Sequence, residues 1–204
     1  MKKIIFLIVI SICLQGCFSS KTSPDYQTME FARLEAKAKR GDLGAIFWLS
    51  DRYFIGQDGN KDEDKASIYF EKFYKELEKK PNTINAPWFQ KAYEQQHPMA
   101  IFFLIILDIE ACLKDDSRGY TEKEINQIGQ KLDLLLSIQK NQSLYSPLAA
   151  EIVEALKLSG LNKLCLQIGN EYKQKNNGDA AETWFSRACQ LGDMESCKLY
   201  LGQW

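Results

Sequence analysis

The chain has 204 residues, of which 45% are hydrophobic and 26% are charged, with 12 glycines and 5 prolines. These proportions are typical of a globular protein with one sizeable core, and they exclude a disordered chain. The formal net charge is −1 and no stripe of basic residues runs along the sequence, so nucleic-acid binding is not expected.

Residues 1–16 are predicted to be a lipoprotein signal peptide. Two lysines precede an apolar run, Ile4 to Leu14, that is too short to cross the roughly 30 Å hydrocarbon core of a membrane as a helix. The LQGC motif that ends at Cys17 resembles the bacterial lipobox. This resemblance implies cleavage after Gly16 and a diacylglyceryl group on Cys17. The alternative is an ordinary signal peptide in which the cysteine is incidental.

Residues 17–28 are mainly polar and are predicted to be a lipidated tether. No aspartate directly follows Cys17, which by analogy with bacterial lipoproteins favours the outer membrane, facing the periplasm. Periplasmic thiols tend to be oxidised, so the cysteines that remain are candidates for disulfides: Cys112, Cys165, Cys189 and Cys197. Four cysteines allow three pairings, and cysteine count alone does not choose among them.

A repeat of two helices joined by a turn is predicted over most of residues 29–204. Apolar residues recur three and four positions apart, which places them on one helical face, and glycines at the turns allow the left-handed conformation that closes a helix. Residues 31–42 fit the end of a preceding unit. The matching segments are 40–56 with 159–172, 65–74 with 180–189, and 88–100 with 184–196.

This pattern resembles the Sel1-like repeat, a relative of the tetratricopeptide repeat. The motif includes an aromatic pair before Lys or Arg and Ala, as in residues 184–188, and a Gly-Asp turn, as in residues 192–193. The resemblance implies an all-α fold, a right-handed α-solenoid of antiparallel helix pairs that cover one another's apolar faces. Ser50 departs from the pattern where glycine is usual, and Asn177 replaces the aspartate that Asp62 keeps.

The middle unit, about residues 113–158, follows no clean register and is predicted to be degenerate. It contains two amphipathic helices, residues 121–140 and 146–156, and Thr121 with Glu124 forms a capping-box pattern at the first. The preceding apolar run, residues 101–107, is predicted to be a central buried helix rather than a membrane contact, since seven residues cannot span a bilayer.

The cysteine spacing is similar to that of the cysteine-rich Sel1-like proteins. The resemblance implies a disulfide between Cys189, at the end of one helix, and Cys197, at the start of the next. Closing this loop stabilises the C-terminal end by about 2.6 kcal/mol in the chain-entropy model. Cys112 and Cys165 are then either a second pair or two free buried thiols.

Little in the sequence supports catalysis. His97 is the only histidine, which excludes sites that need several, and its position before Pro98 predicts a solvated turn residue rather than a base. The Ser-x-x-Lys match at residues 137–140 lacks the motifs that accompany it in penicillin-recognising enzymes. No phosphate-binding loop or Cys-x-x-Cys motif is present. We therefore expect no enzyme activity, no cofactor and no bound metal.

The expected function is the binding of another protein on the concave face of the solenoid. In tetratricopeptide arrays the first helix of each pair lines that face. On this analogy the candidate partner-binding residues are the non-consensus positions of those helices, namely Phe47, Trp48, Asp51, Phe102, Phe103, Gln167 and Asn170. Trp48 is the strongest of them because it lies off the face defined by Ala45 and Leu49. For Phe47, Phe102 and Phe103 the alternative is a place in the core.

Two versions of this function remain open. One is a general envelope scaffold or assembly factor. The other is an immunity protein that neutralises a periplasmic toxin or secreted effector such as a phospholipase, a role that some Sel1-like lipoproteins have. Membrane contact is expected through the lipid anchor only. The alternative class is an envelope hydrolase, which would have to use His97.

Overall fold

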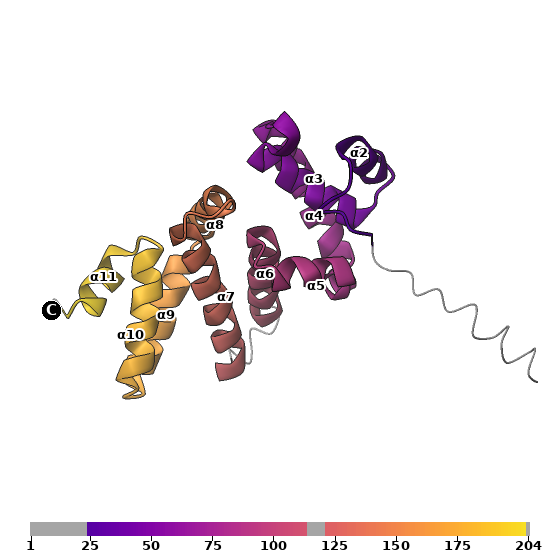
Figure 1. The fold of residues 1–204 in the computed structure, drawn as a ribbon. Helices are drawn as coiled ribbons and strands as arrows, with labels where there is room; N and C mark the ends of the chain where they lie inside the picture. Colours follow the sequence, from indigo (N-terminus) through magenta and orange to yellow (C-terminus); the bar gives the residue numbers. More distant parts are fainter. Residues whose placement is uncertain (1–23, 114–120, 203–204) are drawn as a thin grey trace, which may run out of the picture.

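A computed structural model describes residues 24–113 and 121–202, apart from the side chains of Asp58, Cys112 and Leu113, and within these segments the chain is all-helical without a β-strand. The predicted signal peptide and Cys17 lie outside the described residues. The helices, shown in Figure 1, are α2 (Phe31–Lys39), α3 (Leu43–Ile55), α4 (Glu63–Lys79), α5 (Pro87–Glu94), α6 (Pro98–Leu113), α7 (Glu122–Lys140), α8 (Ser146–Leu158), α9 (Leu161–Gln174), α10 (Gly178–Gln190) and α11 (Met194–Tyr200).

Polar caps begin several helices at the predicted repeat turns. The side chains of Asp42, Asp62 and Asp193 each accept a hydrogen bond from the backbone N–H three residues later, at the starts of α3, α4 and α11. Asn177 does the same at the start of α10, where its amide oxygen accepts from the N–H of Ala180. Because Asn and Asp are about equally good caps, the departure at Asn177 leaves the repeat turn intact.

The helix pairs α3–α4 and α9–α10 pack closely at one equivalent position. In α9, a Cβ added to Gly169 would lie 2.6 Å from the ring of Phe185 on α10, so only glycine fits there. In the first pair Ser50 takes this position, and its hydroxyl donates to the backbone oxygen of Ala66 at 2.8 Å. At this position α3 and α4 are thus joined by a hydrogen bond, whereas α9 and α10 approach closely because glycine has no side chain.

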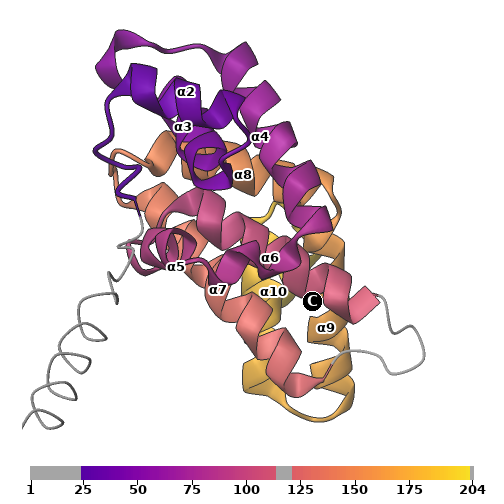
Figure 2. The same cartoon turned by 90° about the vertical axis from the view of Figure 1, so that its right-hand side faces the viewer.

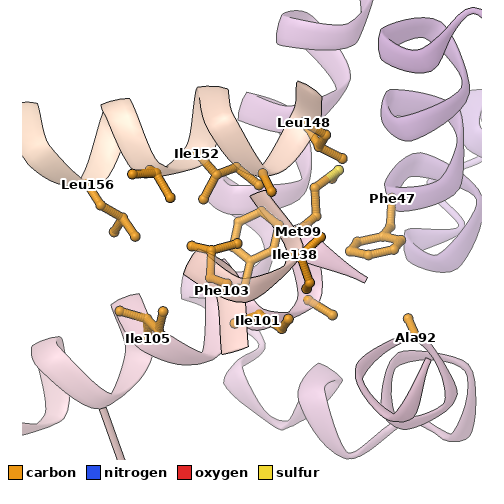
Figure 3. Packing of buried hydrophobic residues seen from close by; sticks show 14 of the residues in the cluster. Phe47, Ala92, Met99, Ile101, Phe103, Ile105, Ile138, Leu148, Ile152 and Leu156 are labelled. Carbon is orange, nitrogen blue, oxygen red and sulfur yellow. The ribbon is translucent and has the colours of Figure 1, made fainter. Parts of the chain in front are cut away.

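The predicted helices of the middle unit are confirmed. Thr121 and Glu124 form the complete capping box at the start of α7, and α8 follows as the second helix. The apolar run at residues 101–107 lies within α6, where Ile101, Phe103 and Ile105 are buried. Figure 3 shows them in one cluster with Ile152 of α8, and the ring of Phe103 also packs against α4, 4.8 Å from the ring of Phe73. Within the described segments, no helix combines the length and the apolar character needed to cross a membrane.

The regular alternation of helices is interrupted after α4. By sequence, α4 and α5 both correspond to α10, the second helix of its pair, yet only the short 3-10 turn Pro81–Asn85 separates them. The eight-residue α5 packs across the side of the molecule next to α6 (Figure 2). In α3, each residue from Gly44 to Tyr53 is buried.

The folded region begins earlier than the predicted boundary at residue 29. Tyr26 is only 6% exposed and belongs to the hydrophobic core. Within the predicted tether, Tyr26 and, in part, Gln27 are therefore packed against the helices.

Candidate partner-binding groove

The structure buries most of the side chains that were expected to line a concave binding face. Phe47 is 0% exposed, Trp48 4%, Asp51 1% and Phe103 1%, so the prediction that they are exposed is wrong. The physical reason is contact with segments distant in the sequence. The ring of Phe47 meets Phe73 of α4 at 5.4 Å and Trp88 of α5 at 5.6 Å. His97 lies against Trp48 and Asp51, and Phe103 packs against Phe73 at 4.8 Å. For Phe47 and Phe103, the alternative of a place in the core is confirmed.

The remaining three candidates are not brought together. Gln167 and Asn170 are exposed on α9, which lies far from α3 in the fold (Figure 1). Phe102 is half-buried on α6 and lines a surface groove. Of the seven predicted residues, Phe102 alone lines this groove.

His97 is not the solvated turn residue that its position before Pro98 predicts. It is 1% exposed, and its Nε2 lies 3.1 Å from Oδ1 of Asp51, itself buried on α3. The rings of Trp48 and Tyr145 enclose the imidazole at centroid distances of 5.0 and 4.7 Å. Burial and the nearby Asp51 carboxylate raise the pKa of Tyr145 to about 12. This pair is sealed inside the core and is not accessible to a substrate.

The hollow best suited to a partner is an apolar groove of about 310 Å³, which we call the central groove. Its walls come from α3 and α4 on one side and from α6 and α8 on the other. Figure 3 shows Met99 of α6 and Leu148 and Ile152 of α8 converging here. The lining residues are Ser50, Phe54, Ala66, Ser67, Phe70, Met99, Phe102, Leu148, Glu151, Ile152 and Ala155.

A second hollow of about 460 Å³ continues the central groove toward the start of α8. The two share Phe54, Ser67 and Glu151, and the outer one adds Leu144, which is 68% exposed. Lys61 pairs with Glu63 at its rim at 2.9 Å. Glu151 is exposed and forms no ion pair with any residue that the structure describes. The central groove is thus mainly apolar, the outer hollow is of mixed character, and Glu151 places an uncompensated negative charge where the two meet.

A polar hollow of about 420 Å³ lies at the other end of the molecule, between α7 and α10. Its central feature is Arg187, whose Nε and Nη2 donate to the two carboxylate oxygens of Asp133 at 2.8 and 2.7 Å. The guanidinium also lies over the ring of Trp184, 4.4 Å from its centroid. Gly129 permits this close approach, since an added Cβ would lie 2.7 Å from Arg187. This cluster joins two helices, and the repeat motif alone did not indicate it.

The disulfide implied by the resemblance is present between Cys189 and Cys197, which joins α10 to α11. Cys165 is a buried free thiol, and burial raises its pKa to about 12. The side chain of Cys112 lies outside the described residues. In the part of the chain that the structure describes, no group of three or more His, Cys, Asp or Glu side chains is placed to hold a metal ion.

Comparisons with known proteins do not identify the chain, because no protein-family model, no curated protein and no solved structure matches it. The likeness to Sel1-like repeats therefore depends on the sequence motifs and on the repeated helix pairs described above.

Proposed function

We propose that the chain is a non-catalytic lipoprotein of the bacterial cell envelope that binds another protein in the central groove. In this proposal its helix pairs form a right-handed Sel1-like α-solenoid, and Cys17 carries a lipid anchor at the periplasmic face of the outer membrane. The observation that carries the proposal is the open apolar groove between α3–α4 and α6–α8.

The central groove offers aromatic surface that a partner can cover. Phe54, Phe70 and Phe102 line it and are only half-buried in the free chain. Phe70 is held in place by ring contacts with Phe102 at 5.6 Å and with Phe103 at 5.1 Å. Rigid aromatic side chains of this kind anchor protein interfaces at a small cost in conformational entropy, and hot spots are enriched in such residues.

The charge at the groove defines the chemistry of the partner. Glu151 lies at the junction of the two hollows and has no ion-pair partner among the described residues. A partner segment with an apolar stripe and a Lys or Arg directed at Glu151 would satisfy both features. Such a charge contributes mainly to specificity and to the rate of association.

A catalytic role has little support in the same geometry. The single histidine is enclosed by aromatic rings and paired with Asp51, so a substrate in the central groove cannot use it as a base. An immunity protein and an envelope scaffold use the groove equally well in this proposal. They differ in whether the bound partner is a toxin.

The proposal is tested by site-specific photo-crosslinking in the producing cell. A photoreactive phenylalanine analogue replaces Ala155, an exposed residue of the groove wall, or Ala36, an exposed alanine of α2 outside the groove. We expect a discrete crosslinked product from position 155 and none from position 36, and the partner is then identified by mass spectrometry. Glu151→Lys should weaken the product. Equal crosslinking from both positions would contradict the groove as the binding site.

A further inference from the structure

Residues 25–28 form a strap that is fixed to the folded helices, although they precede the first helix. Tyr26 is 6% exposed and meets the ring of Trp88 edge to face at 6.0 Å. The Nη2 of Arg52 donates to the backbone oxygen of Gln27 at 2.7 Å. Lys91 of α5 lies 3.6 Å from the carboxylate of Asp25. These contacts hold the strap on α3 and α5.

The fit between the strap and α3 is specific. Gly44 faces the ring of Tyr26 so closely that an added Cβ would overlap the ring. Lys37 lies over the ring of Tyr26, 5.7 Å from its centroid, and donates to the carboxylate of Asp42, the residue that caps α3. A loosely tethered segment would not require a glycine at Gly44. The strap is thus part of the folded domain.

The strap shortens the chain between the domain and the proposed lipid anchor. Only seven residues, 17–23, precede Pro24 if Cys17 carries the anchor. Fully extended, seven residues span at most about 25 Å, whereas the twelve residues of the predicted tether would span about 40 Å. The start of the described chain, next to α5 in Figures 1 and 2, is therefore kept within about 25 Å of the bilayer.

We propose that the strap directs one face of the domain, the surface of α5 that carries Pro87, Trp88 and Lys91, onto the lipid surface. This inference rests on the proposed anchor at Cys17. Pro24 and these three residues border a shallow hollow of about 150 Å³, and Trp88 is half-buried there. Tryptophan favours the interface between lipid and water, and lysine can extend its charge to the headgroups. A short tether on this face raises the effective concentration of the contact.

The test uses the full-length lipidated protein in vesicles of phosphatidylcholine and phosphatidylglycerol with bromine atoms on the upper acyl chains. Bromine quenches tryptophan emission at short range. The chain has four tryptophans, and Trp204 is replaced by Phe in every protein of this test. Trp48 and Trp184 are buried in the core, so the change made by Trp88→Phe isolates the emission of Trp88. We expect quenching in wild type that is largely absent in Trp88→Phe. Equal quenching in the two proteins would overturn the proposal.

Two further variants test the surface and the strap. Lys91→Glu should reduce the quenching, whereas Lys163→Glu, the same change on an exposed site of α9, should not. Inserting about 21 Gly and Ser residues after Ser20 makes the tether about four times longer, which lowers the effective concentration about eightfold. Quenching that survives this insertion unchanged would overturn the role of the strap. Equal losses in the two lysine variants would overturn the contact of the α5 surface with lipid.

Flotation of the vesicles separates failure of this inference from failure of the anchor. Protein that floats with the vesicles but shows no quenching from Trp88 overturns the proposed orientation alone. Protein that does not float and takes up no acyl label overturns the anchor at Cys17 and, with it, the orientation. Binding of a partner in the central groove is measured independently by crosslinking.

Discussion

The pairing of His97 with Asp51 makes a strong prediction about stability. His97→Leu keeps most of the side-chain volume but leaves the Asp51 carboxylate, 2% exposed, without the partner that lies 3.1 Å from it in the native protein. Removing one member of a buried pair costs about 3–5 kcal/mol, because the remaining charge is uncompensated. A domain of this kind has a total stability of about 5–15 kcal/mol. The single variant should therefore lose a large share of its free energy of unfolding.

The double variant Asp51→Leu/His97→Leu tests the cause. When both polar groups are replaced by apolar ones, the penalty for the buried charge disappears, and such replacements are often neutral or stabilising. We expect the double variant to be more stable than His97→Leu alone. Glu71→Gln is the control, since Glu71 and Lys75 form an exposed pair whose loss should cost at most about 1 kcal/mol.

The assay is urea unfolding followed by far-ultraviolet circular dichroism, with the midpoint and slope fitted for each variant. A lower midpoint at unchanged slope for His97→Leu, with recovery in the double variant, supports a stabilising contact between His97 and Asp51 in the core. The reasoning is refuted if His97→Leu loses no more stability than Glu71→Gln. It is also refuted if adding Asp51→Leu to His97→Leu lowers the free energy of unfolding further instead of restoring part of it.

Three further predictions concern other parts of the chain. Replacing Cys189 and Cys197 by Ser should lower the free energy of unfolding by about 2.6 kcal/mol, and a reductant should then have no further effect, in contrast to wild type. Gly169→Ala should cost about 1–3 kcal/mol in thermal or urea unfolding because the new methyl group overlaps a buried ring, whereas Gly178→Ala, with nothing within 4 Å of its Cβ, should not destabilise. Burial raises the pKa of Asp42, but hydrogen bonds and a nearby lysine outweigh it and lower that pKa below 3.8. The ionised Asp42 therefore stabilises the fold fully above pH 3.8, and this stabilisation is lost as the pH falls through the pKa of the folded state. In acid unfolding, Asp42→Asn should thus show a shallower decline in stability than wild type.

The sequence predicted those parts of the fold that depend on local signals. The Gly-Asp turn at residues 192–193 lies between α10 and α11, and Thr121 with Glu124 marked the start of α7. The disulfide followed from a resemblance in cysteine spacing, and it joins helices that are adjacent in the chain. In each of these cases the interacting residues lie within about two helical turns of one another, so a short window of sequence contains the whole signal.

The candidate site depended on contacts between distant segments, and there the sequence was insufficient. The periodicity of α3 correctly identifies one packing face, but the opposite face is covered as well, and Trp48 is buried there against the ring of His97. Asp51 and His97 meet only because α6 starts against α3. One wall of the central groove comes from α8, in the degenerate unit that has no repeat register. No motif could therefore assign Glu151 to the same surface as Phe54.

The contrast between Ser50 and Gly169 bears on how this chain can change during evolution. Arrays of identical repeats can gain or lose a whole unit by unequal recombination, because any copy fits beside any other. Here the first helix pair uses the hydroxyl of Ser50, which donates to the backbone oxygen of Ala66. The α9–α10 pair requires glycine at position 169, because a side chain there would overlap the ring of Phe185. A duplicated or exchanged unit would bring the wrong side chain to this contact. Changes in length should therefore be tolerated in the loops between helices rather than by whole helix pairs.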